Sequence, residues 1–235
     1  MRGDQIDHSL EMLQEYRDRA SKARNMDWYV AERIFGKTLT EAYYDLCTLT
    51  NSSANPMRLF ALMQIAHSAP SGPACELGVW KGLSTLVLSH LAQRDDLTVI
   101  DSFDGLSPAN PTRDGIALAD KSGSVHPPTN YFKVDMDTIT SRFPDSVKVL
   151  KGWVPEVLAE LPEQQWSFVH IDLDLYEPTK AAIEYFIPRM VHGGIIVEDQ
   201  YFTFLFPGAG RAWDETDLTI KVLPTGQGVY VDADK

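Results

Sequence analysis

The chain carries two acidic groups, and each follows an apolar run. Asp172 and Asp174 end the run in the segment HIDLDLYEP. Glu198, Asp199 and Gln200 end the run in GGIIVEDQY. If both runs are strands of one parallel sheet, their carboxyl ends meet at the same edge and these side chains converge. Like charges packed there would repel one another unless a cation lies between them, and oxygen ligands suit Mg²⁺ or Mn²⁺. Solvated strand ends and helix caps are the alternative.

A glycine-containing turn supplies a second kind of chemistry. The segment ELGVWKG carries Glu76, Gly78 and Gly82 where a strand should give way to a helix, and such glycines let the backbone approach a ligand closely. The pattern is not G-x-G-x-x-G, which argues against a nicotinamide or flavin dinucleotide. Asp101, in IDSFDGL, lies 25 residues beyond Glu76, where a carboxylate accepts hydrogen bonds from ribose hydroxyls. The pair favours a nucleoside ligand without a pyrophosphate, and cap or turn roles are the alternative.

These residues need a parallel sheet to bring them together. From residue 73 onward, short apolar runs alternate with helical stretches, which is typical of βαβ units. The predicted strands are 73–77, 97–102, 146–150, 166–172 and 194–198, and the predicted helices are 82–93, 130–143, 155–160 and 178–190. The final segment, LTIKVLPTGQGVYVDAD, predicts a hairpin at the edge of the sheet.

The N-terminal part has helical periodicity with many charges. Residues 5–47 predict two or three helices outside the sheet, and a further helix follows with Ser52 or Ser53 as its cap. We assign residues 1–72 to a helical extension packed on the core and residues 73–235 to the main domain. The apolar and aromatic residues of the extension fit a homodimer interface and packing against the sheet of the same chain equally well.

The segment 106–130 is too long and too rich in Pro, Gly, Ser and Asp for a simple connection. Loops of this size in compact domains are usually functional, so we expect a lid that closes over the acceptor. His126 within it is a candidate second base, and a solvated histidine is the alternative.

Charge and hydropathy exclude some classes of partner. The net charge of −12 argues against nucleic acid, because binding to a phosphate backbone depends on Lys and Arg. No segment approaches the roughly 18 uninterrupted apolar residues of a membrane span, and the N-terminus has no apolar signal region. We therefore expect a cytoplasmic protein that does not bind membranes. Cys47 and Cys75 lie in no metal-binding spacing and should be thiols.

Five segments together resemble, in order and spacing, the macrocin O-methyltransferase (TylF-like) family of bacterial S-adenosylmethionine-dependent sugar methyltransferases. They are CELGVWKG, IDSFDGL, VLKGWVPEVL, HIDLDLYEPTKAAIEYFIPRMVHGGIIVEDQY and PGAGRAWDE, and they cover roughly residues 48–215. The resemblance implies an α/β fold of class I methyltransferase type, a Rossmann-like sheet of about seven strands with the last antiparallel.

The resemblance also implies Mg²⁺-dependent transfer of a methyl group to a sugar hydroxyl, typically on a glycosylated natural product, so the partner is a small glycoside or polyol. Carried over by position, Asp172 and Asp199 are metal ligands together with Gln200, and Asp174 is the general base. The residues assigned to S-adenosylmethionine are Glu76, Gly78, Gly82, Ser84, Asp101, Ser102, Gly152, Trp153 and Asp172. Trp153 either stacks on adenine or caps the core.

Three positions depart from the family pattern. Gln200 stands where a second Asp is usual; its amide oxygen can ligate a cation but leaves the site one charge short. Leu173 separates the two aspartates where Gly is common, which would reshape the floor of the substrate site. Glu198 stands where an apolar residue is usual, and it either supplies the missing charge or faces elsewhere.

Two other functions compete with sugar methylation. An O-methyltransferase of a catechol or other phenol would use much the same metal chemistry, but the polar insert fits a hydroxyl-rich acceptor better. A non-catalytic nucleoside-binding subunit would keep the fold without turnover, and Gln200 would be the first sign of that loss.

Overall fold

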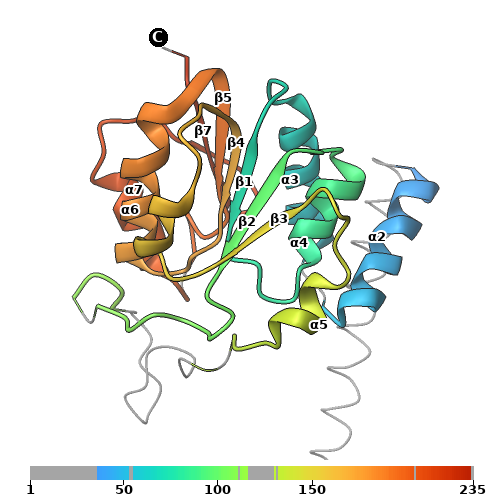
Figure 1. The fold of residues 1–235 in the computed structure, drawn as a ribbon. Coiled ribbons are helices and arrows are strands. Elements are labelled where there is room, and N and C mark those ends of the chain that lie inside the picture. The colour runs from blue at the N-terminus through green and yellow to red at the C-terminus, as the bar shows by residue number, and fades with distance from the viewer. Residues whose placement is uncertain are drawn as a thin grey trace, which may run out of the picture.

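A seven-stranded sheet organises the chain, in the order β3-β2-β1-β4-β5-β7-β6 (Figure 1). The structure is a computed structural model and describes residues 36–52, 55–110, 112–115, 130, 132–203 and 205–233. The strands are β1 (Ala74–Leu77), β2 (Leu97–Asp101), β3 (Lys148–Lys151), β4 (Trp166–Ile171), β5 (Met190–Glu198), β6 (Lys221–Val222) and β7 (Gly228–Val231).

The strand directions confirm the predicted fold class. β1 pairs in parallel with β2 and β4, β2 with β3, and β4 with β5. The final strand, β7, runs antiparallel to β5 and forms the predicted hairpin with β6. The carboxyl ends of the parallel strands therefore share one edge of the sheet.

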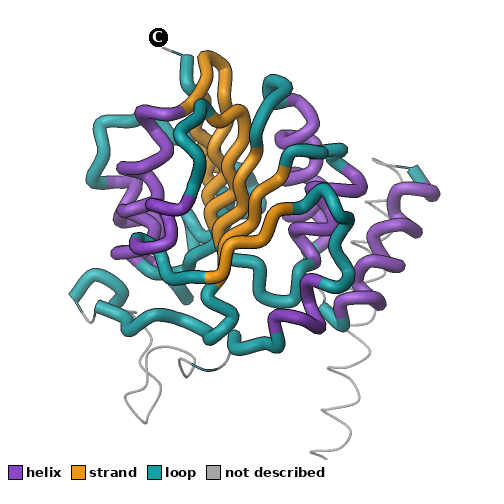
Figure 2. The backbone as a smooth tube through the Cα atoms, viewed as in Figure 1, coloured by secondary structure: helices purple, strands orange, loops and turns teal. Residues whose placement is uncertain are grey.

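Helices cover both faces of this sheet (Figure 2). They are α2 (Lys37–Thr50), α3 (Pro56–Ser68), α4 (Leu83–Leu86), the π-helix η1 (Val87–Leu91), α5 (Met136–Thr140), the 3₁₀ helices η2 (Glu156–Glu160) and η3 (Ile187–Arg189), α6 (Tyr176–Phe186) and α7 (Pro207–Asp214). Two predicted helices are shorter than expected: the one over 82–93 divides into α4 and η1, and the one over 130–143 reduces to α5. None of the described helices is long and apolar enough to cross a membrane.

The cap of α3 differs from the prediction. Asn55, and not Ser52, precedes the helix, and its side-chain oxygen accepts the amide hydrogen of Met57 at 2.8 Å. Pro56 occupies the first helical position, where its missing N–H costs nothing. Ser53 and the segment 1–35 lie outside the described residues.

The core lies on both faces of the sheet, since successive strand residues point to opposite sides. Phe168 of β4 packs with Leu59 and Leu62 of α3, whereas Val169 packs with Ile183 of α6. The described part of the N-terminal extension thus shares a core with the main domain. The boundary at residue 72 stays a prediction.

Arg94 fastens α3 to the sheet. Its buried guanidinium donates hydrogen bonds to the carbonyl oxygens of Ala66, Pro70 and Gly72. It also donates to Oγ of Ser167 at 2.5 Å. One side chain therefore satisfies the acceptors at the end of α3 and in the connection to β1.

Arg94→Ala should lower the free energy of unfolding by about 3 kcal/mol, because buried carbonyls lose a charged donor. Urea denaturation measures this change. Lys148→Ala is the control: it breaks an exposed ion pair with Asp96 and should leave the urea midpoint nearly unchanged. Equal effects of the two substitutions would contradict the anchoring role of Arg94.

Candidate active site

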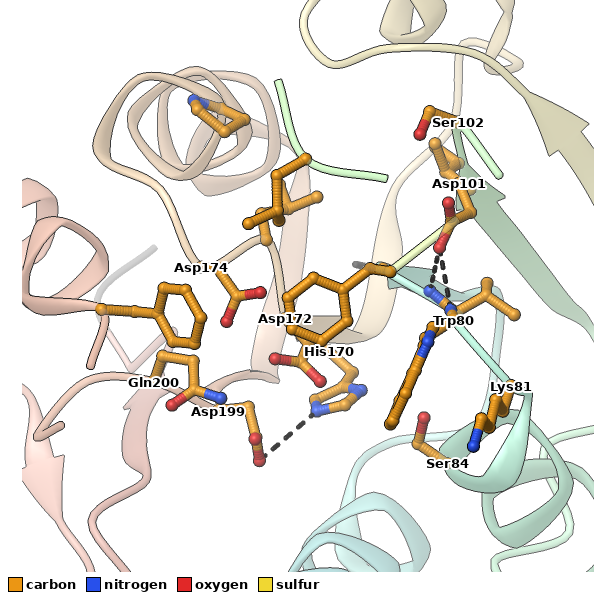
Figure 3. Close-up of a pocket in the computed structure, with 18 of the residues that line it drawn as sticks. Trp80, Lys81, Ser84, Asp101, Ser102, His170, Asp172, Asp174, Asp199 and Gln200 are labelled. Atoms are coloured by element: carbon orange, nitrogen blue, oxygen red, sulfur yellow. Dashed lines mark hydrogen bonds and ion pairs between the residues drawn. The ribbon is translucent and has the colours of Figure 1, made fainter. Parts of the chain in front are cut away.

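A cavity of about 390 Å³ opens at the carboxyl ends of the parallel strands (Figure 3). Its wall includes residues that follow four neighbouring strands: Gly78 after β1, Ser102 after β2, Asp172 after β4 and Asp199 after β5. Cavities of this size hold small-molecule ligands. The site therefore lies where the parallel sheet predicts it.

Most of the residues predicted from the sequence line this cavity. They are Gly78, Ser84, Asp101, Ser102, Gly152, Trp153, Asp172, Asp174, Asp199 and Gln200. Figure 3 shows Asp172, Asp174 and Asp199 gathered on one side of the cavity, with Asp101 and Ser102 across from them. His126 and most of the predicted lid lie outside the described residues.

Two predicted residues are not on the cavity wall. Gly82 begins α4 with a positive φ of 82°, and a Cβ there would lie 2.6 Å from the Phe143 ring. Glu76 is fully buried and accepts a hydrogen bond from Thr85 Oγ1. Neither residue forms the cavity surface, and their contacts with S-adenosylmethionine stay a prediction.

Asp101 holds the glycine turn in place. Its Oδ2 accepts the amide hydrogens of Val79 at 2.6 Å and Trp80 at 2.9 Å, and its Oδ1 accepts that of Phe103 at 2.6 Å. A carboxylate has about four acceptor sites, so one stays available for a ribose hydroxyl. The ribose contact of Asp101 stays a prediction.

Gly78 sets the distance between β1 and the acidic turn after β4. Its φ is +92°, and a Cβ at this position would overlap the main-chain oxygen of Asp172. Only glycine allows this close approach. The turn that should cradle the nucleoside is thus packed directly on the turn that carries the aspartates.

His170 lies on the cavity floor between two carboxylates. Its Nδ1 is 3.1 Å from Glu76 Oε1 and its Nε2 is 3.9 Å from Asp199 Oδ1, the second distance being that of an ion pair and not a hydrogen bond. Burial alone would lower the pKa of His170, but Asp199 and Glu76 raise it to about 10. The two carboxylates therefore favour the positively charged form of His170.

Asp174 has the properties of a buried base. It is 7% exposed and its φ is +63°, a left-handed conformation that is rare for a residue other than glycine. Burial and then the charge of Asp172 raise the pKa of Asp174 well above its usual value. Burial and then Asp199 raise the pKa of Asp172 to about 7. Both carboxylates are thus stronger bases than exposed aspartates.

Asp199 is bound by Arg58, a residue that the sequence patterns did not single out. Nη2 of Arg58 lies 2.5 Å from Asp199 Oδ2 and also donates to the main-chain oxygen of Asp199. Nε2 of Gln227 donates to Asp199 Oδ1 at 2.8 Å. Despite burial, His170 and Arg58 hold the pKa of Asp199 below its usual value.

This arrangement does not fit the predicted divalent-metal centre. Arg58 and Gln227 bind both carboxylate oxygens of Asp199, and Gln200 is neutral. Across the described residues, no three His, Cys, Asp or Glu side chains are placed so that they could hold a metal ion. The positive charge that a metal ion would supply beside Asp199 comes instead from the side chains of Arg58 and His170.

Glu198 does not supply the missing ligand. It is 1% exposed, and its carboxylate accepts hydrogen bonds from Trp213 Nε1 at 3.0 Å and from the amide of Gln200 at 3.1 Å. Burial is the main cause that raises its pKa to about 8. Of the two alternatives for this departure from the family, Glu198 faces elsewhere.

Three aromatic side chains on the cavity wall were not predicted: Trp80, Phe132 and Phe206. The ring centroids of Trp80 and Phe132 are 5.4 Å apart, and those of Phe132 and Phe206 are 6.3 Å apart. Trp80 lies in the glycine turn and Phe132 in the helix predicted over 130–143, but neither ring was assigned to the site from the sequence. Phe206 lies outside the predicted strands and helices. Trp153, 39% exposed, adds a further ring to the wall.

Comparison with known proteins agrees with the resemblance. The chain is 27% identical to 8-demethyl-8-(2,3-dimethoxy-alpha-L-rhamnosyl)-tetracenomycin-C 4'-O-methyltransferase of Streptomyces olivaceus over 58% of this chain and 55% of that protein. It is 26% identical to demethyldecarbamoylnovobiocin O-methyltransferase of Streptomyces niveus over 64% of this chain and 60% of that protein. The chain thus spans less than two thirds of the length of these two relatives.

Solved structures share the fold. The O-methyltransferase NovP superposes with a TM-score of 0.61 at 22% identity, covering 75% of this chain and 80% of that one. CalS11, a calicheamicin methyltransferase, superposes with a TM-score of 0.60 at 20% identity, covering 83% and 93%. The family model of macrocin O-methyltransferase (TylF) matches residues 16–218. The chain therefore belongs to the macrocin O-methyltransferase family.

Proposed function

We propose that this protein transfers the methyl group of S-adenosylmethionine to a hydroxyl of a sugar on a glycosylated natural product. The observation that carries the proposal is a buried carboxylate, Asp174, that faces the glycine turn across one cavity (Figure 3). Family membership supports it, and one relative is named for its action on a rhamnosyl-tetracenomycin.

The residues present fit the methyl donor. Gly78 adds no side chain to the cavity wall, and Trp153 offers a ring for the adenine. The acidic side of the cavity favours a cationic sulfonium group. When bound, S-adenosylmethionine would supply an electrophilic methyl group, and its sulfonium sulfur would leave as the neutral thioether of S-adenosylhomocysteine.

Asp174 would act as the base. A sugar hydroxyl is too weak an acid to ionise at neutral pH, so its proton must leave as its oxygen bonds to the methyl carbon. That proton would pass to a carboxylate oxygen of Asp174, whose raised pKa matches this task. Orientation of the acceptor against the donor would contribute further, on the order of 7–11 kcal/mol for well-aligned reactants.

Asp174→Asn should lower kcat by roughly 10²–10⁴-fold, because the amide cannot take the proton. Binding of S-adenosylmethionine, measured by calorimetry, should stay near the wild-type value. Turnover is followed with labelled S-adenosylmethionine and a panel of glycosides. Asp96→Asn, at an exposed ion pair far from the cavity, is the control. An unchanged kcat in Asp174→Asn would refute the assignment of Asp174 as the base.

The rate should also depend on pH in a defined direction. The base must be deprotonated, and burial and Asp172 raise the pKa of Asp174, so the acidic limb of the kcat profile should lie well above the usual aspartate range. The two aspartates interact, so this limb belongs to the pair. A limb at the ordinary aspartate pKa would contradict a buried base.

A phenolic acceptor is the second candidate. The aromatic residues Trp80, Phe132 and Phe206 give part of the cavity the apolar wall that a planar phenol or catechol requires. Including catechols and phenols in the same panel separates the two acceptor classes.

The proposed mechanism includes no Mg²⁺, although the family implies one, because Arg58 and Gln227 bind Asp199. Arg58→Ala should free Asp199 and strengthen the binding of Mn²⁺, measured by electron paramagnetic resonance, relative to wild type. Lys148→Ala should leave Mn²⁺ binding unchanged. No gain in the Arg58 variant would mean that Asp172 and Asp199 do not form a cation site.

A chelator experiment addresses the wild-type enzyme. Turnover that survives exhaustive treatment with EDTA agrees with Arg58 as the cation of this site. Turnover that is lost and then restored by Mg²⁺ would mean that the ion displaces Arg58 from Asp199.

A further inference from the structure

Asp114 is a buried carboxylate that neither the proposed mechanism nor the sequence motifs use. It lies in the short described stretch 112–115 of the insert and is 1% exposed. Its Oδ1 accepts the amide hydrogen of Tyr176 at 2.7 Å, and its Oδ2 accepts that of Asn110 at 2.8 Å. Burying a carboxylate without hydrogen-bond donors costs free energy, so these two backbone amides stabilise Asp114 at this position.

The bond to Tyr176 caps the helix that follows the aspartate turn. The first amides of a helix have no partner within the helix, and the N-cap residue of α6, Leu175, offers no side-chain cap. Asp114 supplies the cap from 62 positions earlier in the chain. Its negative charge also suits the positive end of α6.

Gly208 in the first turn of α7 makes room for this contact. A Cβ at Gly208 would overlap Oδ1 of Asp114 and lie 2.8 Å from the amide nitrogen of Tyr176. The insert, α6 and α7 therefore meet at one point. This packing accounts for a glycine in the PGAG segment, which the proposed chemistry leaves unexplained.

Further contacts bind the same stretch of the insert to α6 and α7. Arg113 forms an ion pair with Glu215, and its guanidinium lies 4.8 Å from the centroid of the Tyr176 ring. Nη1 of Arg211 donates to the carbonyl oxygen of Arg113 at 2.5 Å. Asp114 is thus the buried centre of a larger attachment.

The attachment lies beside the proposed base. Tyr176 is two residues after Asp174, whose positive φ persists only if the surrounding structure holds both sides of the turn. β4 fixes the preceding side. Earlier residues of the insert, Leu106 and Ser107, line the same cavity, so one carboxylate joins this wall to the turn that carries the base.

We propose that Asp114 is a positioning residue that holds Asp174 in register with the insert side of the cavity. The inference rests on the proposed role of Asp174. It assigns to the insert a fixed anchor at the start of α6.

Asp114→Ala should lower kcat by about 10²-fold, the cost of a small misplacement of a reacting group, while the KM for S-adenosylmethionine stays near wild type. Asp114→Asn keeps an oxygen that can accept from Tyr176 and should restore much of the rate. In the Asp174→Asn background, Asp114→Ala should have little further effect, because the two residues act as a unit.

Hydrogen exchange tests the anchor without any acceptor. Asp114→Ala should speed exchange in a peptide covering residues 173–178 and leave the peptide of β4 protected. Asp135→Ala is the matched control, because it removes an aspartate cap from α5, where Asp135 accepts the amide hydrogen of Thr138 at 2.9 Å. It should change neither kcat nor exchange at residues 173–178.

The outcomes separate the two proposals. Unchanged exchange at 173–178 in Asp114→Ala, or an equal loss of kcat in the wild-type and Asp174→Asn backgrounds, overturns the positioning role. A fully active Asp174→Asn variant, or wild-type protein without methyl transfer to any glycoside or phenol, overturns the proposed function, whatever the exchange data give.

Discussion

Negative charge crowded at one edge of an apolar sheet is the constraint on which the rest of the structure depends. Glu76, Asp172 and Asp199 belong to or follow neighbouring strands, and burial removes the water that would screen them. Such a group can stay ionised only with positive charge among its members. Arg58 and His170 supply that charge, and both do so at Asp199.

Because Arg58 belongs to α3, this helix contributes to the charge balance of the candidate active site. Near the start of α3, Arg58 forms an ion pair with Asp199, which follows β5. Near its end, the carbonyl oxygen of Ala66 accepts a hydrogen bond from Arg94. Between these points Leu59 and Leu62 are buried against the sheet. The charge balance at the strand ends and the packing of α3 on the sheet therefore depend on each other.

The sequence could predict those features of the site that follow from the order and direction of the strands. Asp172 and Asp199 had to converge, because parallel strands end at one edge whatever their side chains do. The role of Arg58 could not be predicted, since it depends on where α3 docks, and no local pattern marks a helical arginine as the partner of a carboxylate 141 positions away. The direction of Glu198 was equally hidden, because Trp213 binds it from a helix that comes later in the chain.

The backbone of the turn explains why a leucine, Leu173, can occupy a position where glycine is common in the family. Among the described residues other than glycine, the left-handed conformation in this turn belongs to Asp174, and Leu173 is not one of those with positive φ. The position where the family commonly has glycine therefore does not need glycine's freedom, and a large side chain fits there. Leu173 packs with the cluster around α6 and also lines the cavity. Leu173 therefore adds an apolar surface to the cavity wall one residue before Asp174.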